Sequence, residues 1–223
     1  MTIKTEKALE KLAEGISEYR SLEASGERHL FLLRIITKGM EMIGEERPIL
    51  VGGGAVEFYT CVRFATGDLD LVSPDVEGCI SVLNALGFER AKKGRHFVNR
   101  EIGALVDLHG DKLLSGEQTV EVVYRKVPLL LVSPEDCIAE RLASFRRHGS
   151  TLDLINAFLV SYHHKNRLDY EHLQSRIGTL DLWDYYRAIQ DIERRLILDE
   201  VGVDEAAGAL IQITKEGPAP CAS

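Results

Sequence analysis

The residues best suited to chemistry lie in two aliphatic segments that carry aspartates. Residues 68–72 (DLDLV) contain Asp68 and Asp70, and residues 104–109 (ALVDLH) contain Asp107. Because side chains alternate along a strand, Asp68 and Asp70 are expected on one face and the leucines on the other. Two adjacent carboxylates repel each other, and a hard divalent cation with oxygen ligands relieves that repulsion. The alternative is a solvated strand face.

If the two strands are neighbours, Asp107 joins Asp68 and Asp70 in one acidic cluster. Three carboxylates suit a two-metal site, which stabilises the attacking and leaving oxygens of an in-line phosphoryl displacement. We therefore expect Mg²⁺ there, or alternatively Mn²⁺, with Asp68, Asp70 and Asp107 as both the catalytic residues and the metal ligands.

Three glycines precede these acids. Gly52, Gly53 and Gly54 follow an apolar strand predicted over residues 49–51 and lead into a helix predicted over residues 55–62. Glycine lets backbone N–H groups approach phosphate, and a helix N-terminus attracts anions. Because the segment has neither P-loop nor dinucleotide-site spacing, we expect a different mode of triphosphate binding.

The strand, the glycines, the helix, Asp-x-Asp and the later aspartate strand together resemble the nucleotidyltransferase-fold superfamily, which includes polymerase-beta-like and minimal nucleotidyltransferases. The similarity covers about residues 46–165 and is closest to a small prokaryotic branch that includes abortive-infection-type toxins. It implies an enzyme that transfers NMP from NTP–Mg²⁺ to an acceptor hydroxyl. The spacing leaves open whether Gly53 or Gly54 contacts phosphate.

The resemblance also implies further nucleotide-binding residues. Arg63 and Thr66 match an Arg-x-Thr segment that precedes the acidic pair in this branch, and Arg141 and Arg146 match basic residues on the helix after the core. The alternative for Arg141 and Arg146 is a structural ion pair with Glu140 or Asp153.

The acceptor and the partners stay open at this stage. A tRNA end, a protein hydroxyl and a small molecule are all compatible with the resemblance, and a cognate antitoxin is a candidate partner. The alternative function is a nucleotide-binding or protein-interaction module that has the fold but no turnover.

Other polar residues near the acids have two interpretations. Residues 91–95 (AKKGR) are the most basic short stretch, either a solvated turn or a patch for phosphates. His96 and His109 flank the aspartate strands, either as surface histidines or as contacts for the acceptor.

Composition restricts the function classes. The chain has 223 residues, 45% hydrophobic, with a net charge of -8, which argues against general polyanion binding. The four cysteines have no metal-like spacing and suggest a reducing compartment. No apolar run reaches the length of a membrane span and no signal-peptide pattern is present, so we expect a cytoplasmic location and no membrane partner.

Hydrophobic periodicity predicts an α/β (α+β) fold with a mixed sheet, flanking helices and a helical C-terminal half. The predicted organisation is a core with N-terminal helices over residues 1–132, a helical region over 133–214 and a disordered tail over 215–223. Strands are expected over 88–90, 96–99, 104–109, 119–124 and 127–132, with helices over 5–19, 28–43, 76–86, 136–147, 151–163, 169–177 and 180–197.

Overall fold

The computed structural model describes residues 12, 14–23, 25–60, 66–91 and 94–197 of the chain. The chain divides into two compact units, the first ending at Ser133 and the second beginning at Pro134. The tail predicted over residues 215–223 lies outside the described residues.

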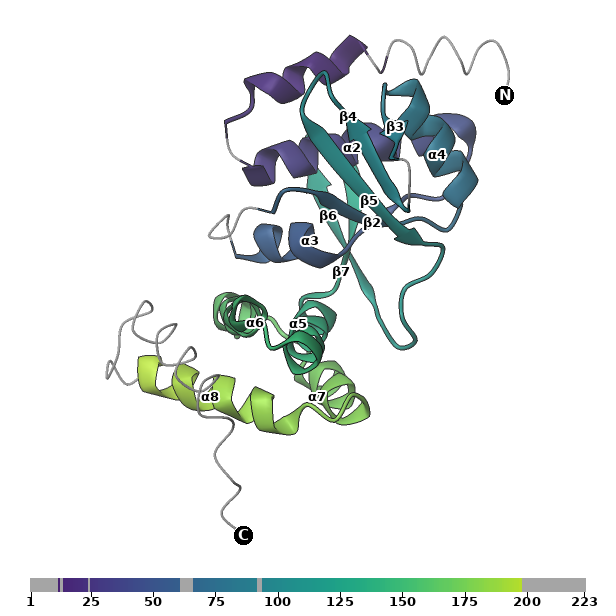
Figure 1. The fold of residues 1–223 in the computed structure, drawn as a ribbon. Coiled ribbons are helices and arrows are strands. Elements are labelled where there is room, and N and C mark those ends of the chain that lie inside the picture. Colours follow the sequence, from purple (N-terminus) through teal and green to yellow (C-terminus); the bar gives the residue numbers. More distant parts are fainter. Residues whose placement is uncertain (1–11, 13, 24, 61–65, 92–93, 198–223) are drawn as a thin grey trace. The chain divides into compact units, whose positions relative to one another are not determined.

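The first unit is built on a mixed sheet with helices beside it (Figure 1). The sheet has seven strands in the order β3-β4-β5-β2-β1-β7-β6. The predicted α/β fold class, a mixed sheet flanked by helices, is therefore confirmed. The strands are β1 (Ile49–Leu50), β2 (Leu69–Val72), β3 (Glu89–Arg90), β4 (His96–Asn99), β5 (Ala104–Gly110), β6 (Thr119–Tyr124) and β7 (Val127–Val132).

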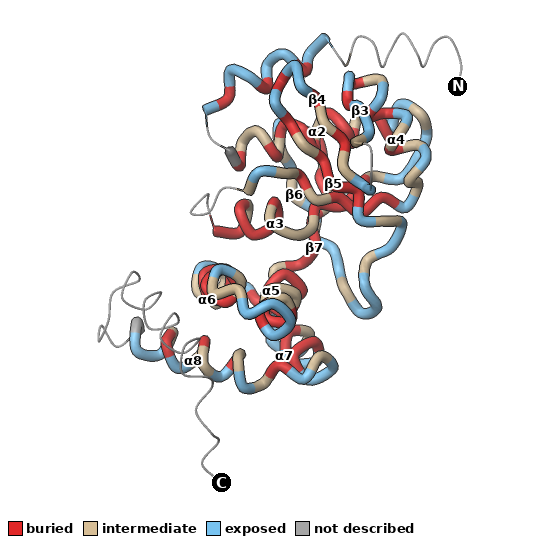
Figure 2. The backbone as a smooth tube through the Cα atoms, viewed as in Figure 1, coloured by how far each residue is buried: buried red, intermediate tan, exposed pale blue. Residues whose placement is uncertain are grey.

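The central strands are mostly buried (Figure 2). In β2, Leu69 and Leu71 are fully buried, whereas Asp70 between them is partly accessible, as the alternation predicts. Strand β2 runs parallel to β5 and antiparallel to β1, and β4 pairs antiparallel with β5. Both aspartate strands therefore lie side by side within the sheet.

Helices of the first unit pack on this sheet. Helix α2 (Ser25–Ile43) contacts β6, β7 and α4 (Val76–Ala85), and α3 (Gly52–Tyr59) contacts β2. The predicted N-terminal helix falls largely outside the described residues, and its described end is a 3-10 helix, η1 (Gly15–Ser21).

Helix α3 begins earlier than predicted, at the glycines themselves rather than at Ala55. Val51 precedes it in extended conformation, and Gly52 has a φ of 58°, a left-handed value that favours glycine. The glycines therefore form the first turn of the helix instead of a separate loop before it.

The second unit consists, in its described part, of α5 (Pro134–His148), α6 (Thr151–His164), α7 (Tyr170–Thr179) and α8 (Trp183–Ile197). Helix α5 packs on α6 and α7, and α8 packs on α6 and α7. The buried Asp136 carboxylate lies 2.6 Å from Arg176 Nε and 2.8 Å from His172 Nε2, so α5 and α7 share a buried ionic contact.

Candidate metal centre

The sheet register places two acids directly opposite each other. Asp70 on β2 and Asp107 on β5 are Cα partners in the parallel pairing. Their side chains are only 14% and 5% exposed. Because carboxylates held so close and so poorly solvated repel each other, this arrangement requires positive charge nearby.

His109 is one of the polar groups that lie beside these two carboxylates. It lies two residues after Asp107 on the same strand and therefore on the same face of the sheet. Its Nε2 atom is 2.8 Å from Asp70 Oδ1 and 3.5 Å from Asp107 Oδ2. One ligand atom from each of these residues lies within 4.8 Å of the others, an arrangement that could hold a metal ion.

Asp107 has two further neighbours on strand β4 and its approach. Arg95 Nε lies 2.8 Å from Asp107 Oδ1 and 2.9 Å from Oδ2. His96 is the Cα partner of Asp107 in the antiparallel pairing, and its Nδ1 lies 3.5 Å from Oδ1. A guanidinium and two imidazoles thus surround this one carboxylate.

The glycine segment is packed directly on Asp70. The Gly53 backbone N–H donates to Asp70 Oδ2 at 2.9 Å, and a Cβ on Gly52 would lie 2.3 Å from the same oxygen. A Cβ on Gly54 would instead meet Leu50 at 2.8 Å, so Gly54 faces the core. Of the two glycines left open by the sequence, Gly53 is the one at the carboxylate.

The group of residues whose donor atoms lie within 4.8 Å of one another contains Asp70, Asp107 and His109 but not Asp68. Asp68 immediately precedes β2, whose first residue is Leu69. Its Oδ1 accepts a hydrogen bond from Thr66 Oγ1 at 2.9 Å, and Thr66 lies close against Gly53. The predicted nucleotide ligand Arg63 lies outside the described residues.

Arg141 and Arg146 belong to the second unit and have partners there. Arg141 pairs with Glu140 and with Asp153, the structural alternative weighed from the sequence. Burial is the largest single influence on Arg141 and opposes its charge, but Glu140, Cys137 and Asp153 together outweigh burial, so the pKa of the guanidinium is raised.

Arg146 has different partners from those considered. Its guanidinium donates to the backbone oxygens of Leu180 and Asp181 at 2.7 and 3.1 Å. These carbonyls follow the end of α7, where helix carbonyls lack partners within the helix, so Arg146 caps that end.

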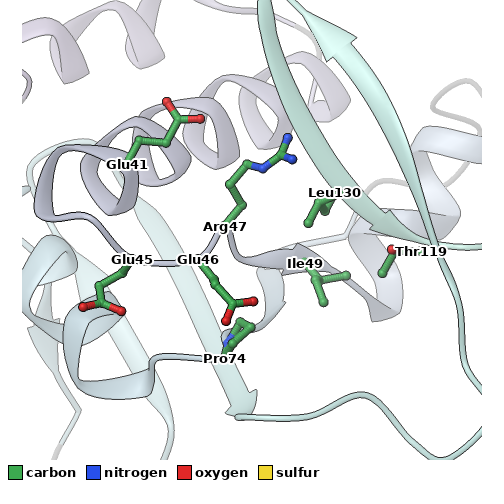
Figure 3. A pocket seen from close by; sticks show the side chains of 8 residues that line it. All are labelled: Glu41, Glu45, Glu46, Arg47, Ile49, Pro74, Thr119 and Leu130. Carbon is green, nitrogen blue, oxygen red and sulfur yellow. The ribbon is translucent and has the colours of Figure 1, made fainter.

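A separate open pocket of about 480 Å³ lies in the first unit (Figure 3). Glu41, Glu45 and Glu46 contribute to its lining, and Arg47, which also lines it, is paired with Glu121 at 2.9 Å. Its lining does not include the carboxylate cluster, and its acidic character disfavours a triphosphate.

Comparison of the chain with protein-family models, curated proteins and solved structures found no match. Among the described residues, no helix is both long enough and apolar enough to cross a membrane.

From the sequence, His109 was considered as a surface histidine or as a contact for the acceptor, and not as a metal ligand. The strand alternation already contained the stronger signal, because a residue two positions after Asp107 must share its face. The contact between Arg95 and Asp107 had no such signal, since it depends on the pairing of β4 with β5.

Proposed function

We propose that this protein is a metal-dependent nucleotidyltransferase, which transfers NMP from an NTP to an acceptor hydroxyl and releases pyrophosphate. The observation that carries the proposal is the direct pairing of Asp70 and Asp107 on neighbouring strands, with the glycine turn of α3 hydrogen-bonded to Asp70. Phosphoryl transfer requires carboxylates that hold metal ions and donors that stabilise the phosphate oxygens. We assign the first role to the two aspartates and the second to the glycine turn.

Asp70, Asp107 and His109 fit a divalent cation, because one donor atom of each already lies within 4.8 Å of the others. A bound cation would supply positive charge for the triphosphate and activate the acceptor oxygen. Asp70 would hold the nucleotide-associated cation beside the glycine turn. Gly53, at the start of α3, would orient the phosphates with the N-terminal end of the helix.

Asp107 would act on the acceptor. The acceptor oxygen forms a bond to the α-phosphorus, the bond to the pyrophosphate oxygen breaks, and the acceptor proton passes to a carboxylate oxygen of Asp107. Arg95 would exchange its contact with Asp107 for phosphate oxygens, because a guanidinium binds both kinds of oxyanion.

The proposal is tested by incubating the protein with each labelled NTP, a divalent cation and total cell extract, and asking which fraction takes up label. Asp107→Asn should abolish labelling. Asp191→Asn makes the same chemical change at an exposed residue paired only locally with Arg194, and it should label like the wild type. Labelling by Asp107→Asn at the wild-type rate would refute the proposal.

A further inference from the structure

We propose that His109 makes this centre selective for a first-row transition ion, such as Mn²⁺ or Co²⁺, over Mg²⁺. The inference rests on the proposed metal-dependent function and specifies its cofactor. It also gives His109 a role as a metal ligand that determines specificity.

His109 is positioned to share a cation with Asp70 and Asp107. Its Nε2 atom lies between the two carboxylates, 2.8 Å from Asp70 Oδ1 and 3.5 Å from Asp107 Oδ2. The side chain is 31% exposed, so an ion from solvent can reach it. A cation bound by these three groups would replace the direct contacts of His109 Nε2 with the two carboxylates.

An imidazole ligand favours transition ions over Mg²⁺. Mg²⁺ demands oxygen ligands in near-ideal octahedral geometry and usually retains several waters. Imidazole nitrogen instead suits transition ions, whose affinity for a given site rises from Mn²⁺ through Co²⁺ along the first row. Replacing a third carboxylate by a histidine therefore shifts the preference of the site away from Mg²⁺.

The hydrogen bonding of Asp107 is a second, independent observation. Asp107 Oδ1 and His96 Nδ1 are buried atoms 3.5 Å apart, and neither makes a hydrogen bond within the described part of the chain. Arg95 provides an ion pair to the same oxygen but leaves its hydrogen-bonding capacity unused. Because a buried carboxylate oxygen is most stable with a well-aligned partner, a cation bound at Asp107 would add a ligand bond to an oxygen that now has an ion pair with Arg95 and no hydrogen bond from the described residues.

The experiment is calorimetric titration of the purified protein with Mg²⁺, Mn²⁺ and Co²⁺ separately, at fixed pH and without nucleotide. The visible spectrum of the Co²⁺ form gives a second readout, because nitrogen ligation changes it. We expect affinity to increase from Mg²⁺ to Mn²⁺ to Co²⁺. His109→Asn should weaken Co²⁺ binding by at least about tenfold and alter the Co²⁺ spectrum, with a much smaller effect on Mg²⁺.

Two other histidines provide matched substitutions. His148→Asn removes an exposed imidazole from the second unit and should leave all affinities unchanged. His96→Asn removes the other imidazole near Asp107, and a loss of selectivity there but not in His109→Asn would overturn the assignment to His109. If His109→Asn does not fold, as judged by circular dichroism, His109→Gln serves the same purpose.

The outcomes separate this inference from the proposed function. An unchanged ratio of Co²⁺ to Mg²⁺ affinity in the folded His109 variant overturns the selectivity, while binding of both ions leaves the proposed function standing. Selective binding without any nucleotide transfer supports the metal assignment and refutes the transferase. Absence of binding of every ion to the wild type overturns both.

Discussion

Gly52→Ala tests how closely the glycine turn is packed on Asp70 of the candidate metal centre. Gly52 has a φ of 58°, and a Cβ there would lie 2.3 Å from Oδ2 and 2.7 Å from Cγ of Asp70. The left-handed backbone costs a non-glycine residue roughly 1–2 kcal/mol. Moving Asp70 aside also breaks its charged hydrogen bond with the Gly53 N–H, which is worth about 1.5–3 kcal/mol.

Gly103→Ala is the matched control. Gly103 has a φ of 68°, but nothing lies within 4 Å of a Cβ built on it. Gly103→Ala should therefore lower the free energy of unfolding only by the cost of the left-handed backbone, roughly 1–2 kcal/mol. Gly52→Ala should lower it by roughly 2.5–5 kcal/mol, because the hydrogen bond to Asp70 is lost as well. Urea denaturation measures both losses, provided that the slope of unfolding free energy against urea concentration is the same in the variants and the wild type.

Metal titration provides the second measurement. Gly52→Ala should weaken divalent-cation binding because it displaces a carboxylate oxygen of the centre, and Gly103→Ala should not. Equal stability losses in the two variants, together with wild-type metal affinity in Gly52→Ala, would show that Asp70 is not held by the glycine turn.

Other substitutions test single contacts. Asp70→Asn and Asp107→Asn each remove a proposed metal ligand, so both should weaken NTP–metal binding. Asp107→Asn should in addition lower the transfer rate of the bound nucleotide more than Asp70→Asn does, because it also removes the proposed proton acceptor, and equal transfer rates at saturating nucleotide would contradict that role. Arg95→Ala removes a cation from Asp107, so divalent-ion affinity by calorimetry should rise, and a fall would mean that Arg95 does not compete. Burial raises the pKa of Glu193 in the folded protein above its pKa in the unfolded chain. The folded protein therefore binds more protons between these two pKa values, and the free energy of unfolding falls as the pH rises through that range. Glu193→Gln should therefore raise the melting temperature at pH 7, and this gain should disappear below about pH 4.5.

Much of the sheet was predictable because its hydrophobic pattern is local. The segments predicted over 119–124 and 127–132 coincide with β6 and β7, and the hairpin predicted from 88–90 and 96–99 is formed by β3 and β4. An acidic cluster was expected from the sequence only if the two aspartate strands were neighbours, and the pairing of β2 with β5 meets that condition. In β6 and β7 the spacing of the apolar residues alone indicates the strand, whereas β3 consists of the exposed Glu89 and Arg90.

The details of the centre depended on contacts that no local pattern specifies. The start of α3 at Gly52 depends on Asp70 accepting the Gly53 N–H, a contact between distant residues. Asp68 was expected in the strand, but it lies in the bend just before β2, where it accepts a hydrogen bond from Thr66. A short polar residue can bond locally in this way instead of extending a ladder, which periodicity alone does not reveal.

The parallel pairing of β2 with β5 also has a consequence for folding kinetics. Helix α4 and the β3–β4 hairpin lie between these strands in the chain, so Asp70 and Asp107 meet only after a long loop closes. Contacts that form late are largely absent from the folding transition state, and stabilising them slows unfolding while leaving the folding rate almost unchanged. An ion at 100 times its Kd stabilises a protein by about 2.7 kcal/mol, which would lengthen the lifetime of the native state roughly a hundredfold. The centre would then protect the finished fold against opening without guiding the chain toward it.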